Sequence, residues 1–475
     1  MSYKLFTQRV GLIGITNILA NLSGIILLPI LTKNLTLYEY GVWVQFNVTI
    51  GLLSMVAMLG LNNAIVRFLP AEKKDERRDA ILSIAFFIFV IGLMLSLLML
   101  TASEILLQLI GNKEVILILA LVVPVYCINL AFLDFFMAIG QMKRYSFFFL
   151  LQIYGDVLLI SYFVQFGIME VVSAVLFVRI GAFLLMFFYL IKEFGFAIPT
   201  FSRMREYLRY SLPLIPATVS AWIVSSSDRY LIAYFLGVSY AGLYSPGYSI
   251  GTVIFMFGTP VVAVLTPTIS KLYEEDKSEE VKKYLSYSLK YFLLLAIPSV
   301  FGLTILSKQL LIILTTGEIA NQGYLVVPFV ALSALLYQIG GVYGQILMLT
   351  KKTRIMGITS ILAAVTNFIL NLIFIPSFGI VGAAITTLIA YSLIAVIIIF
   401  SSSKYFTFDT DWLFLLKSIS ASILMSIAIL LVNPIQTLDV LVWVGIGAGM
   451  YVCVLFLLRG FPKEEIRFFR ELFHI

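Results

Sequence analysis

Residues 80–101 read AILSIAFFIFVIGLMLSLLMLT, a stretch that contains no charged side chain. A helix that crosses the hydrocarbon of a bilayer needs about 20 consecutive, mostly apolar residues, and this stretch supplies them. A helix that is apolar on all sides is stable only in a large protein core or in lipid. The segment therefore predicts a membrane-spanning helix.

Segments of the same kind recur along the whole chain. They lie near 10–32, 41–66, 80–101, 115–139, 146–166, 171–191, 210–235, 242–267, 287–307, 323–348, 355–375, 380–400, 412–432 and 438–458. Membrane barrels are built from much shorter segments of alternating hydrophobicity, so runs of this length indicate helices. We expect an all-α polytopic membrane protein with about 14 transmembrane helices.

The composition agrees with a membrane protein. Of the 475 residues, 61% are hydrophobic and 12% are charged, whereas soluble domains average about 45–50% and about 25%. The two cysteines, Cys127 and Cys453, lie far apart in apolar stretches, and the single histidine, His474, is next to last. These positions predict neither a disulfide framework nor a metal site nor histidine-based catalysis.

The basic residues alternate with the predicted spans. With a cytoplasmic N-terminus, the outside loops hold only Lys33, Lys113 and Lys308, and Arg67, Arg179, Arg229 and Lys417 lie in or at the edge of spans. All other Lys and Arg residues of the 32 then fall inside, as the positive-inside rule requires. We therefore expect a multi-pass protein of the cytoplasmic membrane with both termini in the cytoplasm. The net charge of +7 is explained by this topology and does not require a nucleic-acid partner.

The second half of the chain resembles the first. Residues 35–43 (LTLYEYGVW) match residues 236–244 (LGVSYAGLY) in the leucine, the glycine and the final aromatic residue. Further on, a basic turn precedes a span that ends in Gly-Ile, at Gly167–Ile168 in the first half and at Gly379–Ile380 in the second. An even number of spans separates equivalent points, so the halves share one orientation and are related by an axis along the membrane normal.

This repeat predicts the domain organisation. We expect two six-helix bundles, an interfacial helix between them formed around Phe201, Met204, Tyr207 and Leu208, two additional helices and an amphipathic tail. The boundaries are an N-terminal six-helix half at 1–192, a cytoplasmic interfacial linker at 193–209, a C-terminal six-helix half at 210–400, two extra transmembrane helices at 401–458 and a cytoplasmic tail at 459–475.

A few ionisable residues lie inside the predicted spans, where a charge costs several kcal/mol and is a functional candidate by default. Asp156 and Arg179 lie equally far before and after the Gly167–Ile168 turn, so we expect them near the midplane on neighbouring helices, where they can form an ion pair. The pair can serve only to neutralise itself and fix the two spans together. Alternatively, Arg179 faces a cavity and binds an anionic headgroup.

Asp228 and Arg229 follow the run Ser225-Ser226-Ser227. Consecutive helical residues point about 100° apart, so we expect these two side chains to face different ways. A polar run of this length predicts a segment that lines water or another helix rather than lipid.

Asparagine pairs occupy single helix faces at Asn17 and Asn21 and at Asn367 and Asn371. Such pairs form hydrogen bonds between membrane helices, and they can also bind substrate.

Several short motifs resemble those of one transporter family. They are Ser227-Asp228-Arg229-Tyr230, Leu236-Gly237, Ala241-Gly242-Leu243-Tyr244, Tyr38-Glu39-Tyr40-Gly41-Val42-Trp43 and Asn63-Ala64-Ile65-Val66-Arg67-Phe68. In order and spacing they resemble the polysaccharide-transporter branch of the multidrug/oligosaccharidyl-lipid/polysaccharide (MOP) exporter superfamily, the Wzx-type O-antigen flippases. The resemblance extends over essentially the whole chain.

The resemblance implies a transporter rather than an enzyme: a flippase that moves a polyprenyl-diphosphate-linked oligosaccharide from the cytoplasmic to the outer leaflet by alternating access. Its implied partners are the lipid bilayer, the lipid-linked oligosaccharide and the polysaccharide-assembly machinery, with no cofactor and with a proton or sodium ion as candidates for coupling. Arginine binds diphosphate through paired hydrogen bonds. The substrate-binding candidates are therefore Arg67, Arg179 and Arg229, and the coupling or ion-pair candidates are Asp134, Asp156 and Asp228.

Three alternatives stay open. A lipid II flippase would also carry two spans beyond the repeat. A MATE-type cation-coupled multidrug exporter would often carry a carboxylate in the first span, where this chain has none between Arg9 and Glu39, although Asp228 keeps this alternative open. A membrane enzyme acting on lipid-linked sugars would need a large outer loop with catalytic groups, and the predicted outer loops are short.

Overall fold

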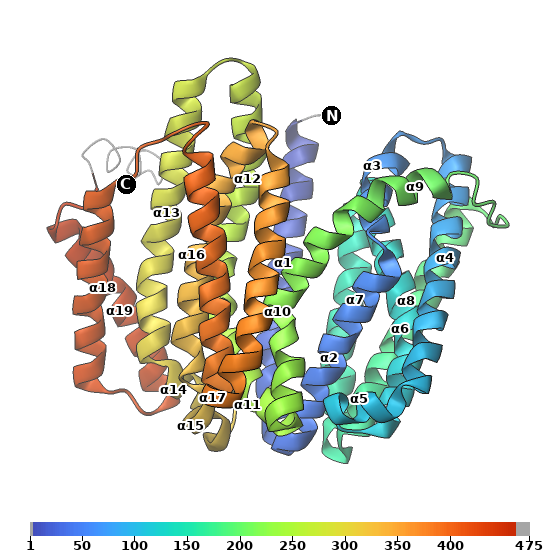
Figure 1. The fold of residues 1–475 in the computed structure, drawn as a ribbon, viewed down its shortest axis with the longest axis horizontal. Helices are drawn as coiled ribbons and strands as arrows, with labels where there is room; N and C mark the ends of the chain where they lie inside the picture. Colours follow the sequence, from blue (N-terminus) through green and yellow to red (C-terminus); the bar gives the residue numbers. More distant parts are fainter. Residues whose placement is uncertain (1–2, 462–475) are drawn as a thin grey trace. The chain divides into compact units, whose positions relative to one another are not determined.

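The computed structural model describes residues 3–461, with side chains from residue 11 onward, and Figure 1 shows this part of the chain as a set of long helices. His474 and the predicted tail from residue 462 onward lie outside the described residues. Packing divides the chain into two compact units, residues 1–242 and 243–475. The second half predicted from the repeat begins earlier, at residue 210, so the repeat boundaries stay a prediction.

The first unit consists of helices joined by short turns. They are α1 (Tyr3–Asn34), α2 (Leu37–Met58), α3 (Leu61–Phe68), η1 (Leu69–Ala71), α4 (Lys74–Thr101), α5 (Ser103–Ile110), α6 (Lys113–Ala138), α7 (Met142–Phe163), η2 (Val164–Phe166), α8 (Ile168–Phe194), α9 (Met204–Ser211), η3 (Leu212–Leu214) and α10 (Ile215–Leu236). Helix α6 packs against α2, α3, α4, α7 and α8 and forms the centre of this unit.

The second unit begins within α11 (Val238–Gly251). It continues with η4 (Thr252–Ile254), α12 (Phe255–Glu274), α13 (Ser278–Ile305), α14 (Ser307–Leu314), α15 (Gly317–Gly323), α16 (Val326–Leu349), α17 (Thr353–Ser402), α18 (Trp412–Val432) and α19 (Thr437–Leu457). Its core is formed by apolar side chains of η4, α12, α13 and α16.

Twelve helical stretches among the described residues are long and apolar enough to cross a membrane. One of them, α17, has 50 residues and is interrupted by non-helical backbone at Gly379, between the two spans predicted there. Helix α10 is 22 residues long and is not among the twelve, because its polar run lowers its hydropathy. The all-α membrane fold is confirmed, and the count of fourteen is approximate.

One predicted span is broken in the structure. The segment 41–66 was expected to be continuous, but α2 ends at Met58, and Leu59 and Gly60 adopt positive φ angles of 46° and 71° before α3 begins. A Cβ atom at Gly60 would lie 2.9 Å from the carbonyl oxygen of Ser211, so this position needs glycine both for its backbone angle and for the close approach. The prediction of one continuous helix was wrong because average hydropathy does not register a two-residue break.

The repeated motifs adopt similar local structures. Gly167 and Gly379 both have positive φ, at 113° and 61°. Within the first unit, a Cβ atom on Gly41 would overlap the Val238 carbonyl oxygen, and one on Gly242 would lie 3.0 Å from the carbonyl oxygen of Leu37. The two matching glycine motifs therefore form a close backbone contact that larger residues would prevent.

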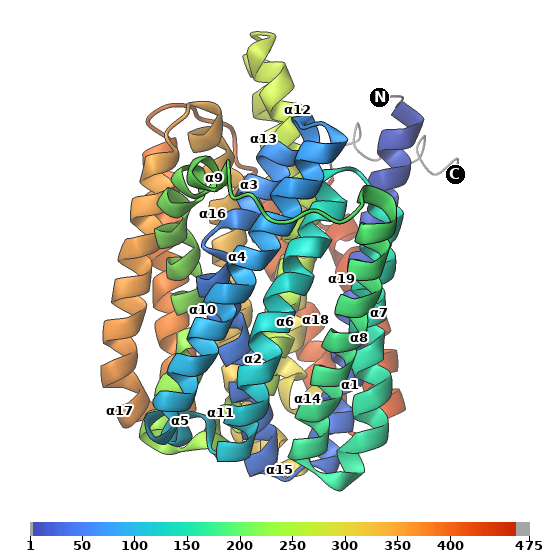
Figure 2. The same ribbon diagram turned by 90° about the vertical axis from the view of Figure 1, so that its right-hand side faces the viewer.

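The predicted interfacial helix is present as α9, which Figure 2 shows beside α3 and α4. Met204 and Tyr207 on this helix are buried, and the Tyr207 hydroxyl donates to Glu72 Oε1 at 2.7 Å. Burial, together with this hydrogen bond, raises the pKa of Tyr207 well above its usual value, so the hydroxyl keeps the proton that it donates. The apolar face of α9 is thus packed in the first unit, and a position on the membrane surface stays a prediction.

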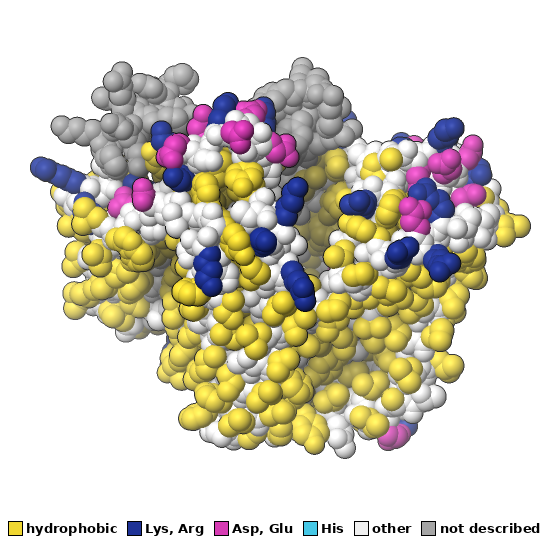
Figure 3. Space-filling view, turned by 45° about the horizontal axis from the view of Figure 1, so that its top comes forward, with side chains coloured by type: hydrophobic (Ala, Val, Ile, Leu, Met, Phe, Trp, Pro, Cys, Tyr) yellow, Lys and Arg dark blue, Asp and Glu magenta, His cyan; other side chains and the backbone are white. Residues whose placement is uncertain are grey.

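The surface has a broad apolar band. On the face drawn in Figure 3, most of the visible Lys and Arg side chains lie away from a broad area of hydrophobic side chains. This distribution fits a protein whose helices cross lipid.

Candidate functional site: charged groups within the membrane helices

The predicted contact between Asp156 and Arg179 is present. Arg179 Nη2 on α8 lies 2.6 Å from Asp156 Oδ2 on α7, and both side chains are largely buried. Gly155 allows this approach, because a Cβ atom there would already lie 3.2 Å from Val178 Cγ1 of α8. Two neighbouring helices thus hold an ion pair inside the first unit.

Other polar groups surround this pair. Gln152, one turn before Asp156, accepts a long hydrogen bond of 3.5 Å from Arg179 Nη1, and Asn129 on α6 donates to the Arg179 carbonyl oxygen at 2.9 Å. The guanidinium also lies 5.4 Å from the ring centre of Tyr126. Among the described residues, Asp156 Oδ1, Arg179 Nε and Asn129 Oδ1 are nevertheless buried without a hydrogen-bond partner. The cluster therefore has unused capacity to bind a further polar group.

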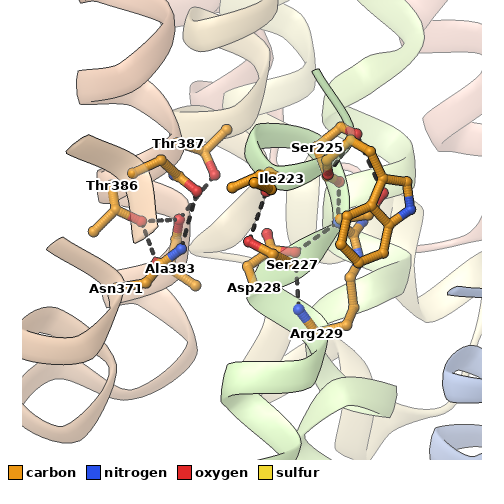
Figure 4. Close-up of polar contacts among 12 residues, drawn as sticks. Ile223, Ser225, Ser227, Asp228, Arg229, Asn371, Ala383, Thr386 and Thr387 are labelled. Atoms are coloured by element: carbon orange, nitrogen blue, oxygen red, sulfur yellow. Dashed lines mark hydrogen bonds and ion pairs between the residues drawn. The ribbon is translucent and has the colours of Figure 1, made fainter. Parts of the chain in front are cut away.

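Asp228 and Arg229 interact with each other, which corrects the expectation that they face different ways. Arg229 Nη1 lies 2.8 Å from Asp228 Oδ1 and also donates to the Ser225 carbonyl oxygen, as Figure 4 shows. The two Cα–Cβ bonds do diverge, but the long arginine side chain folds back along the helix. Ser227, Asp228 and Arg229 are buried, whereas Ser225 and Ser226 are half-buried, so the expectation that this run does not face lipid is confirmed for its last three residues.

Helix α2 holds the polar segment of α10 in place. Gln45 donates to the Arg229 carbonyl oxygen at 2.7 Å, and the Tyr230 hydroxyl donates to Thr49 Oγ1 at 2.7 Å. Hydrogen bonds between helices in lipid contribute about 0.6–2 kcal/mol each. Helix α2 packs against α8 as well as α10, and therefore lies against the helices that carry Arg179 and Arg229.

Arg67 differs from the other two arginines. It lies near the end of α3, its residue is exposed, and its guanidinium stacks on Tyr210 at 4.8 Å from the ring centre. Among the described residues it has no acidic partner within ion-pair distance. Its charge is therefore the most accessible of the three.

Asp134 lies near the end of α6 in a cavity of about 290 Å³ within the first unit. The other lining residues are Ser54, Met55, Met58, Gly60, Asn62, Leu130, Ile215 and Thr218. Within the described residues, Asp134 has neither a hydrogen bond nor an ion pair. We refer to this space as the Asp134 cavity.

The second unit contains a polar group of its own, drawn in Figure 4. Thr386 donates to the Asn371 side-chain oxygen across the break in α17, and Asn371 donates to Asn367 Oδ1 at 3.2 Å. Both asparagines are fully buried. The interpretation of this pair as an interhelical hydrogen-bonding unit is confirmed, whereas Asn17 and Asn21 are exposed.

An apolar groove of about 510 Å³ lies between α13, α18 and α19 in the second unit. Leucine, valine, isoleucine and phenylalanine side chains dominate its lining, and Ser299 and Tyr451 are the polar exceptions. The Tyr451 hydroxyl is already hydrogen-bonded to Ser418 at 2.8 Å. The groove therefore offers an almost purely apolar surface, and we call it the apolar groove.

Some of these features could not be located by sequence reasoning. Gln152 could have been found, since it precedes Asp156 by four residues and shares its helix face. The Asp134 cavity could not, because it depends on how the ends of four helices meet. Lys290, which lies at the start of the predicted span 287–307 and was counted with the inside residues, is buried and lies 3.3 Å from Asp411. In the part of the chain that the structure describes, no cluster of His, Cys, Asp and Glu side chains could hold a metal ion.

The sequence matches two family profiles. The family described as "Polysaccharide biosynthesis protein" matches residues 6–273, and the family described as MatE matches residues 213–373. The first match covers more than half of the chain.

Similar proteins include two from Haloferax volcanii. The "Probable low-salt glycan biosynthesis flippase Agl15" is 25% identical over 57% of each chain, and the "Probable flippase AglR" is 27% identical over 50% of this chain and 52% of its own. The chain thus spans little more than half the length of these relatives. The solved structure of the lipid II flippase MurJ in an inward closed conformation is 18% identical, covers 95% of this chain and 99% of its own, and gives a TM-score of 0.76. At this identity the likeness shows the fold.

The family match and the shared fold agree with the motifs in the sequence. The chain belongs to the polysaccharide biosynthesis protein family.

Proposed function

We propose that this protein is a flippase that carries a polyprenyl-diphosphate-linked oligosaccharide from the cytoplasmic to the outer leaflet by alternating access. The names of the Haloferax relatives support the activity, and the MurJ-like fold supports the architecture. The glycan, the direction and the coupling to a proton or sodium ion are part of the proposal.

The observation that carries the proposal is the presence of arginines in the spans of the first unit. Two charged phosphates cannot cross hydrocarbon alone, and fixed guanidinium groups in a wet path would lower that barrier. Arg179 and Arg229 are buried, each close to one carboxylate, and Arg67 has no acidic partner in the described structure. We propose that Arg67 meets the diphosphate first and that Arg179 and Arg229 bind it further along.

The apolar groove is evidence for the lipid part of the proposed substrate. Exposing a polyprenyl tail to water would cost about 25 cal/mol for each Å² of apolar surface, so the tail must stay in an apolar environment throughout transport. A groove of about 510 Å³ between α13, α18 and α19 has the size of a ligand site. We propose that it guides the tail while the headgroup moves past the arginines.

Two further functions have support of their own. The fold likeness to MurJ favours a lipid II flippase, whose substrate also joins a saccharide to a lipid diphosphate. The unpaired Asp134 and the match to the MatE family favour a cation-coupled exporter of cationic drugs. The three functions differ in the charge and the lipid tail of the transported molecule.

The decisive experiment uses purified protein in liposomes. A polyprenyl-diphosphate-linked oligosaccharide with a fluorescent sugar is placed in both leaflets, and a membrane-impermeant quencher reports how fast the protected leaflet exchanges. The proposal predicts exchange that requires the protein and that a cationic dye does not inhibit. Absence of exchange together with uptake of the dye would instead establish the exporter.

A further inference from the structure

The Asp134 cavity is formed where two helices of the first unit are interrupted. On one side the α2–α3 break places Gly60 in the lining, and on the other the turn η3 leads into α10 at Ile215. Backbone N–H and C=O groups at the ends of helices lack helical partners and can be hydrated where they line a cavity. The two interruptions therefore indicate that this space is a wet cavity built into the unit.

The polar side chains that line the cavity are Ser54, Asn62, Asp134 and Thr218. Asn62 offers amide N–H donors, and the other three offer hydrogen-bond acceptors. Ser54 Oγ donates its proton to the Gly51 carbonyl oxygen at 3.1 Å, and Thr218 Oγ1 donates to the Leu214 carbonyl oxygen at 3.3 Å. Their oxygen lone pairs are left for a ligand, and an ionised Asp134 can only accept. No Lys or Arg is among the lining residues. Such a cavity favours a ligand rich in O–H or N–H donors and disfavours a phosphate.

The size of the cavity distinguishes between a metal ion and a sugar as its ligand. A Ca²⁺ ion needs about six to eight oxygen ligands at about 2.3–2.6 Å, whereas this space of about 290 Å³ has only a few polar side chains around it. The smallest organic ligand sites begin near about 300 Å³. A single sugar ring, with several hydroxyl donors and apolar C–H faces, fits both the volume and the mixture of Met, Leu and polar residues.

We propose that the Asp134 cavity binds one sugar ring of the transported headgroup, with Asp134 accepting hydrogen bonds from its hydroxyl or N–H groups. This inference rests on the proposed function. Helix α10 rises by about 16 Å from Thr218 to Arg229. A diphosphate at Arg229 is thus well separated from the carboxylate, and the ring in the cavity is one that lies several bonds away from the diphosphate. The cavity then recognises the glycan, and the arginines recognise the diphosphate.

The test measures the binding of two defined probes to purified full-length protein in nanodiscs. One probe is bare polyprenyl diphosphate, and the other is polyprenyl diphosphate linked to a tetrasaccharide. We expect wild type to bind the second about tenfold more tightly, the contribution of hydrogen bonds to one charged acceptor. Asp134→Leu should remove this preference and Thr218→Val should reduce it, while both variants keep the wild-type affinity for the bare probe. Asp439→Leu, at an exposed carboxylate outside the cavity, is the matched control.

Each outcome is decisive. If Asp134→Leu keeps the preference for the tetrasaccharide, the cavity does not bind a sugar, although the proposed function stands. If Asp134→Leu weakens both probes equally, the residue supports the fold and the inference is overturned. If wild type binds neither probe, the proposed function fails, and this inference fails with it.

Discussion

Replacing Asp156 by Asn tests how much the stability of the protein depends on the ion pair between Asp156 and Arg179. The change removes the negative charge next to Arg179, whose Nη2 lies 2.6 Å from the carboxylate. Breaking a buried pair typically costs about 3–5 kcal/mol, because a charge is left without compensation. Gln152 and the Tyr126 ring remain beside the guanidinium. We therefore expect the free energy of unfolding to fall by about 3 kcal/mol, the lower end of this range.

The double variant Asp156→Asn with Arg179→Gln should be much less affected. It removes both charges together with the unpartnered Arg179 Nε atom, so about 1 kcal/mol of destabilisation is expected. The assay is unfolding of the purified proteins in mixed micelles with increasing SDS, followed by tryptophan fluorescence. A single variant as stable as the double variant would refute the reasoning and would assign Arg179 a role that does not depend on Asp156.

The remaining predictions concern topology and packing. With Cys at position 112 or 273, in place of Asn112 or Tyr273, an impermeant maleimide should label the first only from outside and the second only from inside, since both termini are predicted to be cytoplasmic. Gly41→Ala should sharply reduce the yield of folded protein, because the new methyl group overlaps a backbone carbonyl oxygen of the first unit, as measured by fluorescence-detected gel filtration. Asp411→Ala should lower the unfolding midpoint by an amount equivalent to about 2–4 kcal/mol, because it removes the N-cap of α18 and leaves Lys290 without this partner.

Matched variants separate these effects from general damage. The labelling uses a Cys453→Ser background, because Cys453 is exposed and Cys127 is buried. Gly24→Ala, where an added Cβ atom meets nothing within 4 Å, should fold normally. Asp411→Asn can still accept the hydrogen bond from the Phe414 N–H group. It should therefore keep the stability that the helix cap contributes and lose only the contribution of the ion pair with Lys290. Labelling with reversed sidedness, normal folding of Gly41→Ala, or no shift in Asp411→Ala would each contradict the corresponding prediction.

Much of the fold could be predicted because lipid imposes a simple rule on composition. Long apolar runs located the spans, and equal spacing from the Gly167–Ile168 turn predicted the contact between Asp156 and Arg179. The break at Leu59–Gly60 was missed because two residues hardly change the hydropathy of a long window. That break depends on the fit of Gly60 against the carbonyl oxygen of Ser211, which only the tertiary structure shows.

The site was predicted less completely than the fold. The helical angle between neighbours gave the wrong expectation for Asp228 and Arg229, because it describes Cα–Cβ directions and not the reach of a long side chain. The Asp134 cavity combines side chains of α2, α3, α6 and α10 that are distant in sequence. No local sequence pattern indicates where helix ends meet. Asp134 could therefore be predicted as a candidate from its charge, but the cavity around it could not be predicted.

The most direct test of the central claim combines Arg179→Gln with Arg229→Gln in cells that have this protein as their only flippase. The measurement is the amount of lipid-linked oligosaccharide precursor that faces the cytoplasm, at matched levels of membrane protein. The account predicts that the double Gln variant accumulates precursor, and that Lys at both positions, which keeps the charge but loses the paired hydrogen bonds, accumulates less. Normal levels of the double Gln variant with no accumulation would contradict the claim that these guanidinium groups carry the diphosphate.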